Sequence, residues 1–268
     1  MGAVIVKFPV FFHFFGRSFD AHLVMELIGY LIAYALYMVL RERSKRPVLP
    51  AEVNIWVIAG CLLGAAAGSK ILAIADSFHT YWAFRHDLQF YLGGKTIVGG
   101  LAGGWIGVEI VKREFGIRQK TGDLFVFPII VGTCFGRVGC FLEGLEDHTY
   151  GIATNLPWGV DFGDGVRRHP TQLYEIVFLI LLAIALLIRM RKPRRDGDLF
   201  LWFAMSYFAW RLAVDFIKPQ DPRDLWLGIS PIQWVCIAGV LAALYNLKKP
   251  TPIIKQEPTD AGSSLPVL

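Results

Sequence analysis

The sequence predicts an all-α polytopic membrane protein with seven transmembrane helices and a small extracytoplasmic head. Hydrophobic residues make up 54% of the 268-residue chain, charged residues only 18%, and the mean hydropathy is +0.47. These values lie far from those of soluble globular domains. The chain also divides into apolar stretches joined by short basic loops. We therefore expect one membrane domain, residues 1–247, and a disordered cytoplasmic tail, residues 248–268, which contains Pro and Ser and has no periodicity.

The elements follow in chain order. Residues 3–16 are apolar but few, include Pro9 and His13, and lack a small-residue cleavage site, which favours an interfacial segment over a cleaved signal peptide. Seven later stretches approach the roughly 20 apolar residues that a spanning helix needs. The third of them is short and rich in glycine. The predicted helices cover residues 22–40, 54–75, 97–111, 124–142, 171–188, 199–217 and 231–247.

Glycines recur at four-residue spacing in the second and third stretches. Small residues at this spacing let two helix backbones approach closely. Tight packing of these two helices is therefore a better explanation than a ligand site. The two series are Gly60, Gly64 and Gly68, and Gly99, Gly103 and Gly107.

Basic residues alternate between the two ends of the predicted helices. The loops within 41–46, 112–120, 189–195 and 248–255 hold 16 of the 27 Lys and Arg residues, against 8 on the opposite side. The positive-inside rule then places the N-terminus outside and the C-terminus in the cytoplasm. The two longest loops, about 76–96 and 144–170, lie outside and form the predicted head. Since topology accounts for the net charge of +5, we expect no nucleic acid partner.

The cysteines indicate neither a disulfide framework nor a metal site. They form no CxxC pair, and all of them lie in apolar stretches, as small packing residues do. Cys140 is the exception that stays open, because it lies three residues after Arg137 on the same helical face. We expect no metal and no cofactor. The four cysteines are Cys61, Cys134, Cys140 and Cys236.

Arg137 lies within the apolar stretch 124–142, where a charge is costly. Its guanidinium does not deprotonate, so it must face a polar cavity, and its planar fork matches phosphate. Tyr207, Arg211 and Asp215 follow one another at one-turn spacing on the stretch 199–217. Two arginines converging on one cavity could bind a phospholipid phosphodiester. The alternatives are an Arg211–Asp215 ion pair on one helix, or neutralisation of each arginine by a nearby Glu.

The string RHPTQLYE, residues 168–175, opens the fifth stretch. Pro170 fits a helix start, and Thr171 and Tyr174 suit capping and interfacial anchoring. His169, Gln172 and Glu175 are more polar than those tasks require. They are therefore candidates for the same polar site.

Three strings together resemble the bacterial prolipoprotein diacylglyceryl transferase family. GRVGCFLEGLEDHTYG, RHPTQLYE and YFAWRLAVDFIKPQD match that family's GRxGNFxNxExxG, RHPSQLYE and YGxxRFxxEFxRxPD, and Gln233 matches a glutamine of its last helix. The resemblance implies a seven-helix inner-membrane enzyme of bacteria. Such an enzyme transfers diacylglycerol from phosphatidylglycerol, a membrane lipid, to the lipobox cysteine at the signal peptide of a preprolipoprotein, and releases glycerol phosphate.

The resemblance also assigns roles. It implies that Arg137, Arg211 and Tyr207 are catalytic and that Asp215 is the family's acid. The other matching polar and glycine positions would bind substrate: Cys140, Glu143, Glu146, His169, Gln172, Glu175, Asp215, Gln233, Gly99 and Gly100.

The chain departs from the family's pattern at three places. Val98 stands before Gly99 and Gly100 where the family has the histidine of an HGG string, proposed there as an essential catalytic residue. Cys140 replaces an asparagine. The family acid that follows is displaced, which leaves Glu143, Glu146 and Asp147 as candidates for its place.

The missing histidine allows two interpretations: a transferase that works without it, or a protein with a different function. A thiol with a pKa of about 8.5 is partly ionised at neutral pH. Catalysis without the histidine is therefore slower or uses a substitute base. The candidates are His169, Glu146 and Tyr207. Otherwise the chain is a paralogue with a different acceptor, or a lipid-binding or lipid-moving protein without chemistry. A solute transporter is the least favoured class, since no internal repeat is evident.

Overall fold

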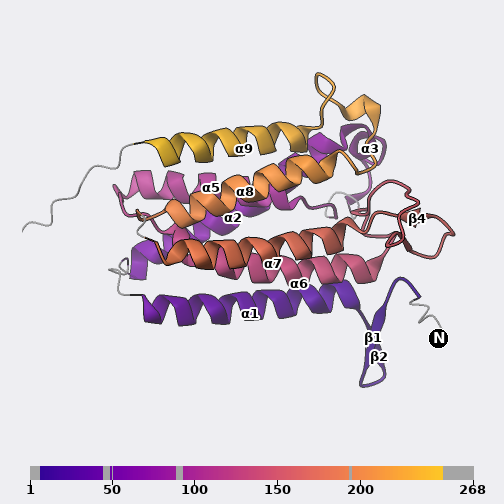
Figure 1. The fold of residues 1–268 in the computed structure, drawn as a ribbon, viewed down its shortest axis with the longest axis horizontal. Coiled ribbons are helices and arrows are strands. Elements are labelled where there is room, and N and C mark those ends of the chain that lie inside the picture. Colours follow the sequence, from indigo (N-terminus) through magenta and orange to yellow (C-terminus); the bar gives the residue numbers. More distant parts are fainter. Residues whose placement is uncertain (1–6, 45–48, 50, 89–92, 193–194, 250–268) are drawn as a thin grey trace, which may run out of the picture.

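The protein is a bundle of long helices that run side by side along its longest axis (Figure 1). The computed structural model describes residues 7–44, 49, 51–88, 93–192 and 195–249. Residues 250–268 of the expected tail lie outside the described part. Each of the seven predicted stretches is helical, with ends that differ by a few residues. They are α1 (Ala21–Arg43), α2 (Ala51–Asp76), α5 (Ile97–Glu114), α6 (Val126–Glu143), α7 (Thr171–Met190), α8 (Asp198–Asp215) and α9 (Pro231–Lys248).

Within the part of the chain that the structure describes, five helical segments are long and apolar enough to cross a membrane. They correspond to α1, α2, α6 with its lead-in turn, α7 and α9. Helices α5 and α8 have 18 residues each and hold more than two charged side chains within that length, including Glu109 and Lys112 on α5 and Arg211 and Asp215 on α8. The fold class of a mostly helical membrane protein is therefore confirmed, while the crossing of α5 and α8 stays a prediction.

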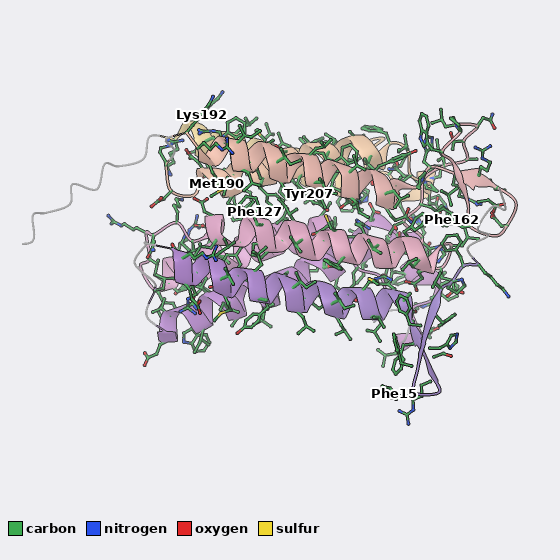
Figure 2. All side chains as sticks on the ribbon, turned by 60° about the horizontal axis from the view of Figure 1, so that its bottom comes forward. Phe15, Phe127, Phe162, Met190, Lys192 and Tyr207 are labelled. Atoms are coloured by element: carbon green, nitrogen blue, oxygen red, sulfur yellow. The ribbon has the colours of Figure 1, made fainter. Side chains whose placement is uncertain are left out.

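Short elements gather at one end of the bundle (Figure 1). These are α3 (Phe78–Ala83), the antiparallel pair β1 (Phe11–Phe14) and β2 (Arg17–Asp20), and the antiparallel pair β3 (Val160–Asp161) and β4 (Arg167–Arg168). The 3-10 turn η2 (Pro222–Asp224) contacts α3. The N-terminal apolar segment thus forms a hairpin, whose tip residue Phe15 is fully exposed and points away from the helices (Figure 2).

The predicted contact between the glycine-rich helices α2 and α5 is confirmed. A Cβ added at Gly64 would overlap the carbonyl oxygen of Gly103, and one added at Gly103 would overlap that of Gly64. The same holds for Gly107 against Gly60 and for Gly99 against Gly68. Only glycine allows this backbone-to-backbone distance.

Helices α1 and α6 approach each other in a similar way. A Cβ at Gly29 would lie 2.9 Å from Cβ of Phe135, and one at Gly139 would lie 3.1 Å from Cα of His22. The side chain of Asp20 caps α1 by accepting a hydrogen bond of 2.6 Å from the backbone N–H of His22. The N-terminal end of α1 is therefore held against the C-terminal end of α6.

The core of the remaining helices is apolar around a few polar groups. Val126, Leu179 and Phe203 pack α6, α7 and α8 together. The N-terminus of α8 is capped from outside its own helix. Asp123, in the 3-10 turn η1 (Gly122–Phe125) before α6, accepts hydrogen bonds from the backbone N–H groups of Gly197 at 3.0 Å and Phe200 at 3.1 Å.

Candidate active site

Two buried arginines from different helices meet at one carboxylate. Arg137 on α6 places Nε 3.0 Å from Oε2 of Glu175 on α7, and Arg211 on α8 places Nη1 2.9 Å from the same oxygen. Tyr207, one turn before Arg211, donates a hydrogen bond of 2.6 Å to Oε1 of Glu175. Tyr207 lies about midway along the bundle (Figure 2). We call Arg137, Glu175, Tyr207 and Arg211 the arginine cluster.

Several polar atoms at this cluster have no hydrogen-bond partner among the described residues. The Nε–H of Arg137 is close to Glu175 but not aligned for a hydrogen bond, and the Nε–H of Arg211 also lacks an acceptor. Gln172, one turn before Glu175, is 1% exposed, and neither atom of its amide is bonded. Buried polar groups are normally hydrogen-bonded. The cluster thus offers both donors and an acceptor to a polar ligand.

The charge of the cluster also favours an anion. Two guanidiniums and one carboxylate carry a formal charge of +1 inside the bundle. Lys218, just beyond the end of α8, is partly buried near them. Burial, followed by repulsion from Arg211 and Arg137, lowers the pKa of Lys218 to about 7. The local excess of positive charge matches a monoanionic phosphodiester.

Asp215 does not pair with Arg211 within the described residues. Its Oδ2 accepts hydrogen bonds from Ser230 Oγ at 2.7 Å and from Gln220 Nε2 at 2.7 Å. Ser230 and Gln233 cap α9 reciprocally, each accepting from the other's backbone N–H at 3.1 Å. Asp215 therefore joins the end of α8 to the start of α9, where Gln233 completes the cap. The predicted alternative of an Arg211–Asp215 ion pair is wrong, because Glu175 takes that place across the bundle.

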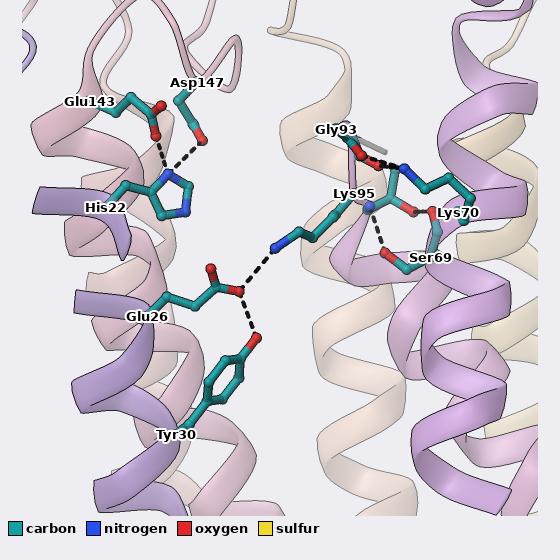
Figure 3. Close-up of polar contacts among 11 residues, drawn as sticks. His22, Glu26, Tyr30, Ser69, Lys70, Gly93, Lys95, Glu143 and Asp147 are labelled. Atoms are coloured by element: carbon teal, nitrogen blue, oxygen red, sulfur yellow. Dashed lines mark hydrogen bonds and ion pairs between the residues drawn. The ribbon is translucent and has the colours of Figure 1, made fainter. Parts of the chain in front are cut away.

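A second polar cluster lies one turn beyond Arg137. Nη1 of Arg137 donates to Sγ of Cys140 at 3.7 Å. His22 of α1 contacts Glu143 of α6 through Nδ1, which also lies 3.7 Å from Oδ1 of Asp147. Figure 3 shows the imidazole facing both carboxylates. Two of the three candidates for the displaced acid, Glu143 and Asp147, therefore lie side by side at His22.

The other predicted site residues make no hydrogen bond or ion pair with the arginine cluster within the described part of the chain. Glu146 is exposed, and Nδ1 of His169 lies 3.1 Å from the hydroxyl of Tyr174. Gly99 and Gly100 face α2, where a Cβ at Gly100 would meet Ala65 and Ser69 at 3.8 Å. Val98 is fully buried in an apolar cluster with Phe208 and Cys236. No polar side chain replaces the family's histidine at its own position.

One residue of this region was missed by sequence reasoning. His22 lies in the first turn of α1, more than a hundred positions before Cys140, and its local sequence does not show which residues it contacts. A signal was nevertheless present. Asp20 before an apolar stretch predicts a helix cap, and a histidine in the first turn of a spanning helix is a candidate functional group.

Comparison with known proteins decides the family. A family model described as prolipoprotein diacylglyceryl transferase matches residues 9–248. The chain belongs to this family. Among similar proteins, the phosphatidylglycerol–prolipoprotein diacylglyceryl transferase of Clostridium tetani is 31% identical over 245 residues, covering 88% of this chain and 95% of its own length. Its namesake in Bordetella parapertussis is 31% identical over 254 residues, covering 87% and 89%. That of Campylobacter lari is 30% identical over 239 residues, covering 81% and 84%.

Membership in the prolipoprotein diacylglyceryl transferase family agrees with the predicted resemblance. The matched region includes the arginine cluster, the second polar cluster around His22 and all seven helices from α1 to α9 that were predicted from the sequence. The three departures, Val98, Cys140 and the displaced acid, thus lie within the region that the family model matches. Two of them lie in or beside the polar clusters described above.

Proposed function

We propose that this chain is a membrane transferase that moves diacylglycerol from phosphatidylglycerol to the cysteine thiol of a preprolipoprotein. The observation that carries the proposal is the convergence of Arg137 and Arg211 on one oxygen of Glu175. Two guanidiniums already aimed at one anionic oxygen form a suitable site for a phosphodiester. The names of similar proteins supply the two substrates.

The reaction suits this arrangement. The thiol sulfur attacks the glycerol carbon that bears the phosphate ester, the carbon–oxygen bond breaks, and the bonding electrons leave with glycerol phosphate while the thiol proton passes to a base. The leaving group develops negative charge that preorganised arginines stabilise. Of the three candidate bases, Tyr207 belongs to the arginine cluster, where its hydroxyl donates to Glu175, so it would accept the thiol proton by passing its own proton to that carboxylate. Gln172, with a free amide beside Glu175, is suited to bind a polar part of the lipid headgroup.

The proposal includes a topology. All seven long helices cross the bacterial inner membrane, with the N-terminus outside and the C-terminus in the cytoplasm. The end that carries α3 and the two strand pairs is then the extracytoplasmic head of the domain 1–247. The loops 76–96 and 144–170 contribute α3 and the β3–β4 pair, and residues 11–20 add the β1–β2 pair. Its position suits a signal peptide that emerges from the membrane. Helices α5 and α8 are covered by apolar neighbours, which supports their placement in the membrane.

The test is transfer in vitro. Purified protein, labelled phosphatidylglycerol and a lipobox peptide are expected to give a lipidated peptide. Arg137→Ala and Arg211→Ala are each expected to lose at least about 100-fold of the rate, as removal of a transition-state donor does. Arg223→Ala is the matched control, because Arg223 is exposed and pairs with Asp221. Wild-type protein that forms no product with any lipoprotein would refute the proposal.

One observation favours a second function. Val98 lies in an apolar cluster, so the family's histidine has no substitute at that place. A protein that binds or moves phosphatidylglycerol without chemistry would keep the arginine cluster alone. In the same assay this function predicts lipid that is bound in an Arg137-dependent manner and recovered intact. A paralogue with another acceptor predicts transfer only when a different thiol is offered.

A further inference from the structure

Four metal-ligating side chains meet where the end of α6 contacts the start of α1. The ligand atoms of His22, Cys140 and Asp147 all lie within 4.8 Å of one another. Glu143 joins them through its direct contact with His22 Nδ1. Figure 3 shows His22, Glu143 and Asp147 from this group converging from α1, α6 and the loop after α6. We propose that these four residues form a binding site for one divalent transition-metal ion, with zinc as the best fit.

The distance between His22 and Asp147 suits a shared ion, whereas the carboxylate of Glu143, in direct contact with His22 Nδ1, has to turn aside before both can bind the same ion. Zinc bonds its nitrogen, oxygen and sulfur ligands at 2.0–2.3 Å in a tetrahedron, so two ligand atoms on one ion stand roughly 3.3–3.8 Å apart. His22 Nδ1 and Asp147 Oδ1 are 3.7 Å apart. A set of one imidazole, one thiol and carboxylates is a borderline-soft set that selects zinc or its neighbours over magnesium and calcium.

The surroundings hold the ligands in place. Gly139 allows His22 to lie against α6, because any side chain there would press on the His22 backbone. Asp20 fixes the backbone of His22, and Thr149 donates a hydrogen bond to Asp147. Cys140 is held from the other side by Arg137 at 3.7 Å. Support of this kind around the ligands is typical of a metal site.

The charges balance with an ion in place. A thiolate, two carboxylates and a neutral imidazole sum to −3, since metal binding displaces the thiol proton. A divalent ion reduces this to −1. The adjacent arginine cluster carries +1, so the two clusters together become neutral. The competing explanation is a protonated His22 paired with its two carboxylates, which needs neither an ion nor Cys140.

The experiment uses Co²⁺ as a spectroscopic probe of the purified full-length protein after treatment with a chelator. We expect one equivalent to bind, with a thiolate-to-cobalt charge-transfer band and the visible bands of a four-coordinate ion, and zinc to remove both. Cys140→Ser is expected to lose the charge-transfer band and to weaken binding at least about 10- to 100-fold. Cys134→Ser is the matched control, because Cys134 lies on the same helix within an apolar core.

Two results would overturn the proposal. One is the absence of stoichiometric Co²⁺ or Zn²⁺ binding to folded wild-type protein, which leaves the His22–carboxylate ion pair. The other is a charge-transfer band that persists in Cys140→Ser. If Cys140→Ser does not fold, His22→Asn serves instead and is expected to weaken binding similarly while keeping the sulfur band. The readout is metal binding, so it is independent of any transferase activity.

Discussion

The α2–α5 pair and the α6–α7–α8 group are held together by opposite means. In the first, glycine backbones touch along three turns, with Gly64 and Gly103 at the centre. In the second, a carboxylate bridges two guanidiniums from neighbouring helices, and Tyr207 completes the bonding. Close backbone contact stabilises helices in lipid by van der Waals packing. Buried charge is a costly way to obtain the same cohesion.

This difference indicates which of the two regions carries the function. A bundle that can pack through glycine does not need an ionic bridge for stability alone, so Glu175 and its two arginines indicate a ligand. Changes to the glycine contact should lower stability and leave the chemistry of the folded protein intact. Changes to the arginine cluster should lower both the stability and the transfer activity. The following predictions test that division, from the largest expected effect to the smallest.

Replacement of Glu175 by Ala should have the largest effect. It leaves two buried guanidiniums without their shared carboxylate, and breaking a buried ion pair costs about 3–5 kcal/mol. We expect a lower yield of folded protein, a lower thermal midpoint in detergent and loss of transfer. A Glu26→Gln control, whose partner Lys95 is exposed, should change the midpoint little. An unchanged midpoint in Glu175→Ala would show that the bridge is not what joins these helices.

Replacement of Tyr207 by Phe should be milder. The ring and its packing against Phe203 stay, and one hydrogen bond of 2.6 Å to a carboxylate is lost. Hydrogen bonds to charged groups contribute about 1.5–3 kcal/mol. We expect a reduced transfer rate with a modest fall in the thermal midpoint. A rate equal to wild type would remove Tyr207 from the catalytic residues.

Replacement of Gly103 by Ala should lower stability and spare activity. The added Cβ overlaps the carbonyl oxygen of Gly64, so α2 and α5 must separate, at a cost of about 1–3 kcal/mol. Gly136→Ala is the matched control, since a Cβ there meets nothing within 4 Å. The thermal midpoint of Gly136→Ala should equal that of wild type or be higher. Equal effects of the two variants would contradict the glycine contact.

Replacement of Lys218 by Met should change how the free energy of unfolding depends on pH. The folded pKa of Lys218 is about 7, below its ordinary 10.5, so the unfolded chain binds more protons between those values. The free energy of unfolding of wild type should therefore rise as pH increases from 7 to 9, through this group. Lys218→Met should show a flatter profile and a higher midpoint at pH 7. Parallel profiles would mean that neither burial nor the arginines lower the pKa of Lys218 in the folded protein.

Much of this arrangement could be predicted from sequence. Hydropathy predicts every long helix, the glycine spacing predicts the α2–α5 contact, and the cost of a buried guanidinium predicts that Arg137 and Arg211 meet. The shared partner could not be chosen, because Asp215 and Glu175 fit equally well by residue type, and only the orientation of α7 selects Glu175. The contact partners of His22 could not be predicted, for the same reason. Its neighbours come from α6, and no local pattern encodes which helix packs against α1.

Asp123 has a consequence for how the chain assembles as it is made. The cap that α8 requires is not encoded next to α8 but 74 positions earlier, in the turn before α6. That turn is synthesised first, so the acceptor for the backbone of Gly197 and Phe200 already exists when those residues arrive. Helix α8 brings Arg211 with it. The second arginine is therefore synthesised after the first, on a helix whose N-terminal cap precedes it in the chain.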